Sequence, residues 1–199
     1  MLQVQIIEEL NNFLQNYLNL KFKPLSSREL NIFRIQGNSE AINHRRNDSE
    51  KIKVLPWFDD FFIYVEIRFV NDYTHKLISL SIFQGSINDI KKNQLFRAEW
   101  DDYNIDNESR PQPHWHITRD NAVYDKFSDL TNHSDEKEKV GFEFYEEVLT
   151  EVFDTKQIHF AMSGNWQNQE SPVHKIDDAI KVVKWIEGLL EHIKYELQN

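Results

Sequence analysis

The sequence predicts an α+β domain, in which a mainly antiparallel sheet of about five to six strands is flanked by N-terminal and C-terminal amphipathic helices. Apolar residues recur at helical spacing near both ends of the chain, and in several segments between them they alternate with polar residues. Strand and helix segments do not alternate along the chain, which argues against a doubly wound parallel sheet. Because 199 residues fit one domain, we expect a single unit over residues 1–199.

The first predicted element is an amphipathic helix over residues 4–18. Its apolar side is formed by Val4, Ile7, Leu10, Leu14 and Tyr17. Residues 30–36 alternate and contain no helix breaker, so they predict a strand that Gly37 ends. The polar and charged residues 37–53 predict a loop.

The clearest strand covers residues 61–70, where Tyr64, Glu66 and Arg68 lie opposite a fully apolar side. Residues 77–83 return as the second arm of a hairpin, because Asn71 and Asp72 supply turn chemistry between them. Residues 94–101 predict a third strand of this central group. A short strand over residues 114–118 follows.

The last part of the chain predicts one more strand and a helix. Residues 158–162 are apolar enough for a further sheet strand, whereas residues 142–153 are compatible with either a strand or a helix. A final helix is expected to begin near Pro172, since proline is favoured in the first turn. Its expected buried side is Ile176, Ile180, Val183, Ile186, Leu190, Ile193 and Leu197.

Composition narrows the classes of function. The chain has no cysteine, which excludes disulfides, thiolate metal sites and a cysteine nucleophile. Its net charge of −10 argues against a nucleic-acid-binding protein, because such proteins usually carry a basic excess or a basic stripe. The sequence contains no apolar run of the roughly 20 residues that a membrane span needs, and its first 20 residues do not resemble a signal peptide. A cytoplasmic location is the resulting expectation.

Polar residues are expected to gather on one face of the sheet. Since successive side chains of a strand point to opposite faces, each of three strands has one apolar and one polar side. The polar sides carry, in chain order, Arg97, Glu99 and Asp101, then His114, His116 and Thr118, then His159, Ala161 and Ser163. If the three strands share a sheet, these polar sides meet.

Such a group supports two kinds of chemistry. His114, His116 and His159, with Asp101, could hold a divalent metal such as Zn or Mn, because nitrogen and oxygen ligands suit these ions. Alternatively, His116 and His159 could transfer protons, with Glu99 assisting. Arg97 would then stabilise a small anionic substrate such as a phosphoester. The sequence therefore predicts a hydrolase-like site, with or without metal.

Two other interpretations remain open. A polar sheet face exposed to water carries the same residue types without any catalytic role. A non-catalytic interaction protein, such as a subunit or an inhibitor, would instead use the acidic surface to meet a basic protein partner.

Short motifs resemble two families. The segment His116-Ile117-Thr118 is similar to one His-x-Thr/Ser motif of the 2H phosphoesterases, but the second copy, His159-Phe160-Ala161, lacks the hydroxyl. The spacing of His114, His116, Asp120 and His159 is similar to the metal-binding motifs of cupins, where the third of these residues is normally Glu. Each match covers a few residues, and neither family is assigned.

Overall fold

The computed structural model describes residues 2–19, 23–26, 31–45, 48–70, 75–102, 112–117 and 174–199. Within them it has two helices and eight strands, which confirms the predicted α+β class. The elements are α1 (Leu2–Leu18), β1 (Lys23–Ser26), β2 (Ile32–Gln36), β3 (Ser39–Arg45), β4 (Asp48–Phe58), β5 (Phe61–Val70), β6 (His75–Gln84), β7 (Asn93–Asp101), β8 (His114–Ile117) and α4 (Ala179–Gln198).

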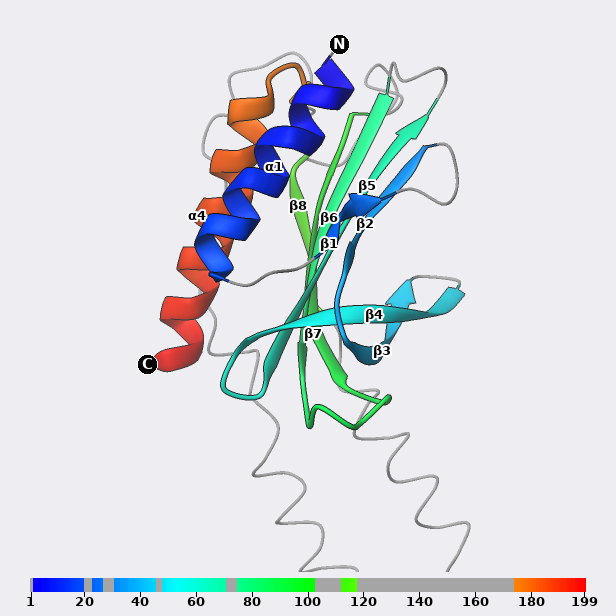
Figure 1. Ribbon diagram of the computed structural model, residues 1–199, viewed down its shortest axis with the longest axis vertical. Helices are drawn as coiled ribbons and strands as arrows, with labels where there is room; N and C mark the ends of the chain where they lie inside the picture. The colour runs from blue at the N-terminus through cyan, green and yellow to red at the C-terminus, as the bar shows by residue number, and fades with distance from the viewer. Residues whose placement is uncertain are drawn as a thin grey trace, which may run out of the picture.

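The strands form a curled antiparallel sheet. Its main path runs β1-β2-β5-β6-β7-β8, and β4 joins β5 on the same edge as β2. Strands β3 and β4 form a hairpin. Figure 1 shows the two helices on one side of the sheet and this hairpin on the other.

The helices cover the apolar face of the sheet. This face carries the alternating residues Ile63, Val65 and Ile67 of β5, all fully buried. At one end, the rings of Trp100 and Trp185 meet edge to face at 5.6 Å, which joins β7 to α4. Since each of these side chains buries a large apolar area, the helix–sheet interface is the main core of the described chain.

The prediction of a loop over residues 37–53 is wrong. Strand β3 and the first part of β4 occupy most of this segment and pair from Ser39 with Val54 to Arg45 with Asp48. The buried positions of β3 include Ser39 and Asn43, so the strand lacks the apolar alternation by which strands are recognised.

The two predicted helices exist, with corrections. Residues 174–178 are not helical, and α4 begins at Ala179, capped by Asp178, whose carboxylate accepts a hydrogen bond from the Ile180 amide at 2.7 Å. Ile180, expected on the buried side, is 60% exposed, and Ala179 and Val182 are buried instead. In α1, Val4 is 49% exposed and Ile6 takes the buried position. The predicted strand over residues 158–162 lies outside the described residues.

Candidate functional site

The strand register places the predicted polar residues in two rows across one face of the sheet. Partners directly opposite each other point to the same face. One row is Glu66, Ser79, Glu99 and His114, and the next is Tyr64, Ser81, Arg97 and His116. On β8, Trp115 points to the opposite face and meets Phe96 edge to face at 5.6 Å.

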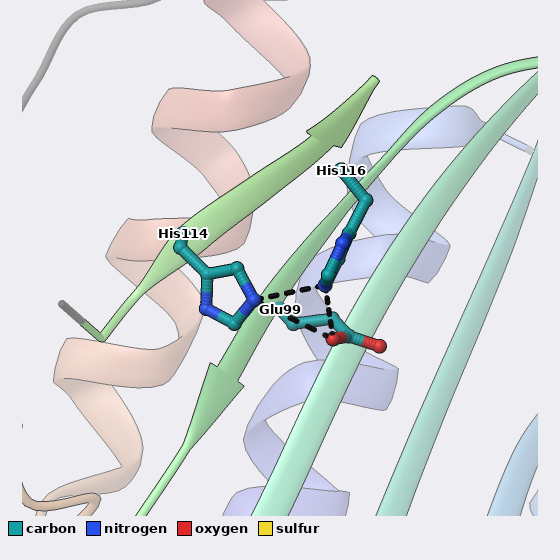
Figure 2. Close-up of side chains that lie close together, drawn as sticks. All are labelled: Glu99, His114 and His116. Atoms are coloured by element: carbon teal, nitrogen blue, oxygen red, sulfur yellow. Dashed lines mark hydrogen bonds and ion pairs between the residues drawn. The ribbon is translucent and has the colours of Figure 1, made fainter. Parts of the chain in front are cut away.

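Glu99, His114 and His116 converge at the end of these rows. The Nε2 atom of His116 lies 2.7 Å from Oε2 of Glu99 and 2.8 Å from Nε2 of His114. The remaining edge of the triangle, from His114 Nε2 to Glu99 Oε2, measures 3.8 Å. Figure 2 shows the two imidazole rings and the carboxylate turned toward one common point.

The ligand atoms of Glu99, His114 and His116 all lie within 4.8 Å of one another, so these three side chains could hold one metal ion. The two short edges, 2.7 and 2.8 Å, are hydrogen-bond separations, and in this structure the imidazoles and the carboxylate form a hydrogen-bonded group. Three protein ligands on one side leave the other coordination positions for water or substrate, as catalytic metal sites do.

Arg97 orients the Glu99 carboxylate from the side away from the histidines. Its Nε donates to Oε1 of Glu99 at 2.7 Å, and its Nη1 donates to the His44 carbonyl of β3 at 2.8 Å. The Arg97 side chain is only 9% exposed. A guanidinium held at both ends keeps the Glu99 carboxylate in one orientation, with Oε2 left for the histidines.

The charges around Glu99 favour its ionised form. Burial raises the pKa of the carboxyl, but the hydrogen bond with His116 and the nearby charge of Arg97 outweigh this effect and lower the pKa to about 2. Glu99 is therefore a carboxylate at neutral pH, as a metal ligand or a partner of a proton-transferring histidine must be.

The other predicted site residues lie apart from this convergence or outside the described chain. Asp101 is one row further along β7, opposite Leu77, and its amide donates to Gln112 Oε1 at 3.0 Å. It does not belong to the group formed by Glu99 and the two histidines in the described residues. His159 lies outside the described residues.

A second polar cluster on the same face was not predicted. Glu66 is fully buried and accepts hydrogen bonds from Arg34 at 2.7 Å, Arg45 at 2.6 Å, Arg68 at 2.5 Å and the Tyr64 hydroxyl at 2.8 Å. The alternation of Tyr64, Glu66 and Arg68 in β5 was the available signal. Nothing in the sequence indicated that Arg45 belongs to the cluster, because its strand was expected to be a loop.

This cluster joins the hairpin to the sheet through charge. Burial raises the pKa of Glu66, but the hydrogen bond from Arg68 and the charge of Arg45 outweigh burial and lower it. Burial, together with the negative charge of Glu66, raises the pKa of Tyr64. Glu66 is therefore a buried anion surrounded by donors, which is the condition under which a buried charge is tolerated.

Comparison with known proteins identifies no relative of this chain. No family model, no curated protein and no solved structure matches the chain. None of the helices in the described part of the chain is long and apolar enough to cross a membrane. Fold and site together define the chain as an α+β protein with a possible His/Glu metal-binding group.

Proposed function

We propose that this protein is a hydrolase that binds a divalent metal, Zn or Mn, and acts on a phosphoester or a related small anionic substrate. The observation that carries the proposal is the convergence of Glu99, His114 and His116, whose ligand atoms all lie within 4.8 Å of one another. Asp101 and His159 remain candidate additional ligands, since three protein ligands leave room for more.

The proposed chemistry follows from the residues of the site. A divalent ion supplies Lewis acidity toward a phosphoryl oxygen. Water gives up a proton as it adds to phosphorus, the ester P–O bond breaks, and the departing alkoxide takes up a proton. In the metal-free form, His116 and His159 are the proposed proton carriers, and Glu99 orients His116 through their 2.7 Å hydrogen bond. With a metal bound, Nε2 of His116 would be a ligand instead, and His159 is then the proposed proton carrier. Arg97 adds positive charge beside the anion.

Metal content is the direct test of the metal site. The protein is stripped with a chelator, reloaded with Zn or Mn, passed through a desalting column and measured by inductively coupled plasma mass spectrometry. We expect near-stoichiometric metal in the wild type and a loss of at least tenfold in His114→Ala/His116→Ala. His192→Ala, on α4, is the matched control and should keep its metal.

Hydrolysis is then tested with a chromogenic phosphoester. Turnover that depends on added metal and disappears in the double variant supports the proposed reaction. A wild type that retains no metal after reloading, with circular dichroism showing an intact fold, refutes the metal-dependent form. Metal-independent turnover lost in His116→Ala would then support acid–base hydrolysis, and no turnover would favour the interaction-protein alternative.

A further inference from the structure

The sheet forks along one edge of β5. Strand β2 pairs with the second half of β5, from Ile32 with Arg68 to Arg34 with Glu66, and β4 pairs with the first half near Phe62. Both use the same edge, because the other edge pairs with β6 along its whole length. Tyr64 of β5 lies between these two pairings, and away from it β2 and β4 diverge. Figure 1 shows β2 curving toward the hairpin that β4 forms with β3.

A hollow of about 670 Å³ lies within this fork. Its volume falls in the range of small-molecule sites, which is roughly 300–1,000 Å³. Apolar surface comes from Ile32 and Ile52, and Tyr64 lies at the branch point. The lining thus combines apolar contact area with a few charged groups, as ligand sites do.

Backbone crossing closes one end of the hollow. At Gly37, where β2 passes into β3, a Cβ atom would stand 1.8 Å from the carbonyl oxygen of Val54 in β4. Because the two strands touch backbone to backbone here, only glycine fits. The close approach of the two strands at Gly37 therefore fixes the backbone beside the hollow.

The charge of the lining is opposite to that of the chain. Lys51, Lys53 and Arg34 line the hollow together with one carboxylate, Glu40, in a protein whose net charge is −10. Because Arg34 is already paired with Glu50 and Glu66, the excess positive charge is the single charge by which Lys51 and Lys53 exceed Glu40. Such a local reversal of sign attracts a small anion.

Glu40 occupies the position that a ligand anion would take. One of its oxygens lies 2.6 Å from Lys51 Nζ and the other 2.7 Å from Lys53 Nζ. The lysine side chains are 59% and 54% exposed, and ion pairs that are this exposed contribute little. A stronger anion can replace Glu40 between the two ammonium groups. Arg34 is held in place by Glu50 and Glu66 at the side of the hollow.

We propose that the forked hollow binds a phosphate-bearing small molecule through its phosphate group. A phosphate dianion that displaces Glu40 matches the two positive charges of Lys51 and Lys53, and lysines bind phosphate as point charges. Lys51 and Lys53 contact the phosphate, and Ile32 contacts the organic part. This site is separate from the proposed metal centre and does not depend on it.

The test measures binding of inorganic phosphate and of adenosine monophosphate by isothermal titration calorimetry at low ionic strength. We expect saturable binding by the full-length wild type. In Lys51→Gln/Lys53→Gln the affinity should fall at least tenfold. In Glu40→Gln it should rise several-fold, because the competing carboxylate is gone. Lys181→Gln, which removes an exposed lysine of α4 that pairs with Asp177, is the control and should bind like the wild type.

The opposite changes in the two variants distinguish a site from nonspecific attraction. Higher affinity in Glu40→Gln together with lower affinity in Lys51→Gln/Lys53→Gln supports the proposal for whichever of the two molecules binds. It is overturned if neither molecule binds saturably to wild type or to Glu40→Gln. Equal affinity in wild type and the double lysine variant would also overturn it, because the anion would then bind elsewhere.

Discussion

At the scale of single residues, Glu99 connects three parts of the molecule. One oxygen accepts from Arg97, and the other meets His116. Arg97 in turn reaches the His44 carbonyl of the hairpin. The orientation of the carboxylate therefore depends on a residue that does not itself belong to the metal-ligand triangle.

Arg97→Gln should weaken the proposed metal site without removing a ligand. Loss of a group that orients a ligand typically lowers metal affinity about 10–100-fold. Competition with a fluorescent chelator measures the change. Arg68→Gln is the matched control, because it removes an arginine of the same sheet face that contacts Glu66 and not Glu99. Equal affinity in wild type and Arg97→Gln would show that Arg97 does not position the carboxylate.

Glu66 makes a second prediction, on stability and pH. Its folded-state pKa is lower than the ordinary 4.5, so its stabilising contribution is present above about pH 4.5 and is lost as the pH falls toward the folded-state value. Glu66→Gln should therefore unfold more easily at pH 7 by roughly 2–3 kcal/mol. That is below the roughly 3–5 kcal/mol of a fully buried pair, since the three arginines are partly exposed.

Urea denaturation of wild type and Glu66→Gln at several pH values checks this prediction. The difference in the free energy of unfolding should shrink between pH 7 and pH 3. Glu40→Gln, at an exposed ion-paired carboxylate, provides the comparison and should change stability little at pH 7. A difference that stays constant with pH would mean that the charge of Glu66 is not what stabilises the cluster.

At the scale of elements, the sequence predicts best where a strand has one apolar and one polar face. Strand β5 has the bounds expected from the alternation of its apolar residues, and the faces of β7 follow the same rule. The hairpin could not be found this way, because Asn43 is buried by bonding to Gln94 from another strand. Such polar burial leaves no periodic apolar signal in the sequence.

The candidate site was predictable only in part, for a similar reason. Alternation within one strand assigns Glu99 to one face of β7 and both His114 and His116 to one face of β8. Whether these faces meet depends on strand order, which local patterns do not encode. The pairing of β7 with β8 supplies it, with Glu99 opposite His114.

The crossing at Gly37 gives a prediction for the hairpin as an element. In Gly37→Ala the new methyl group would overlap the Val54 carbonyl, which is backbone and cannot rotate away. We expect a loss of about 1–3 kcal/mol, as for other overpacked positions. Gly188→Ala is the control: nothing lies within 4 Å of its Cβ position, and alanine in a helix should stabilise by about 0.5–1 kcal/mol. Urea midpoints that fall in Gly37→Ala and rise in Gly188→Ala would confirm both predictions. Equal midpoints in the two variants would contradict the tight crossing at Gly37.

At the scale of the whole molecule, three layers must be held in register. Charge and polar hydrogen bonds attach the hairpin to the sheet, through Glu66 and Arg97. Apolar packing attaches the helices, with the contact of Trp100 and Trp185 at one end. The segment before α4 connects to the ends of β6 and β7 through the buried carboxylate of Asp102. One oxygen accepts from the Lys76 amide at 2.6 Å and the other from the Ile176 amide at 3.1 Å.

Asp102→Ala should therefore loosen the attachment of α4 to the sheet. The side chain is almost fully buried, so its removal leaves the amides of Lys76 and Ile176 without this acceptor. Each unsatisfied buried group costs about 1–3 kcal/mol, and we expect a total loss of about 2–4 kcal/mol. Near-ultraviolet circular dichroism during urea denaturation measures it, because Trp100 packs on α4 beside this contact. Asp177→Ala, which removes an exposed aspartate close to the same helix start, should change stability by less than about 0.5 kcal/mol. If the two variants unfold at the same urea concentration, Asp102 does not connect the helical layer to the sheet, and apolar packing alone holds α4 in place.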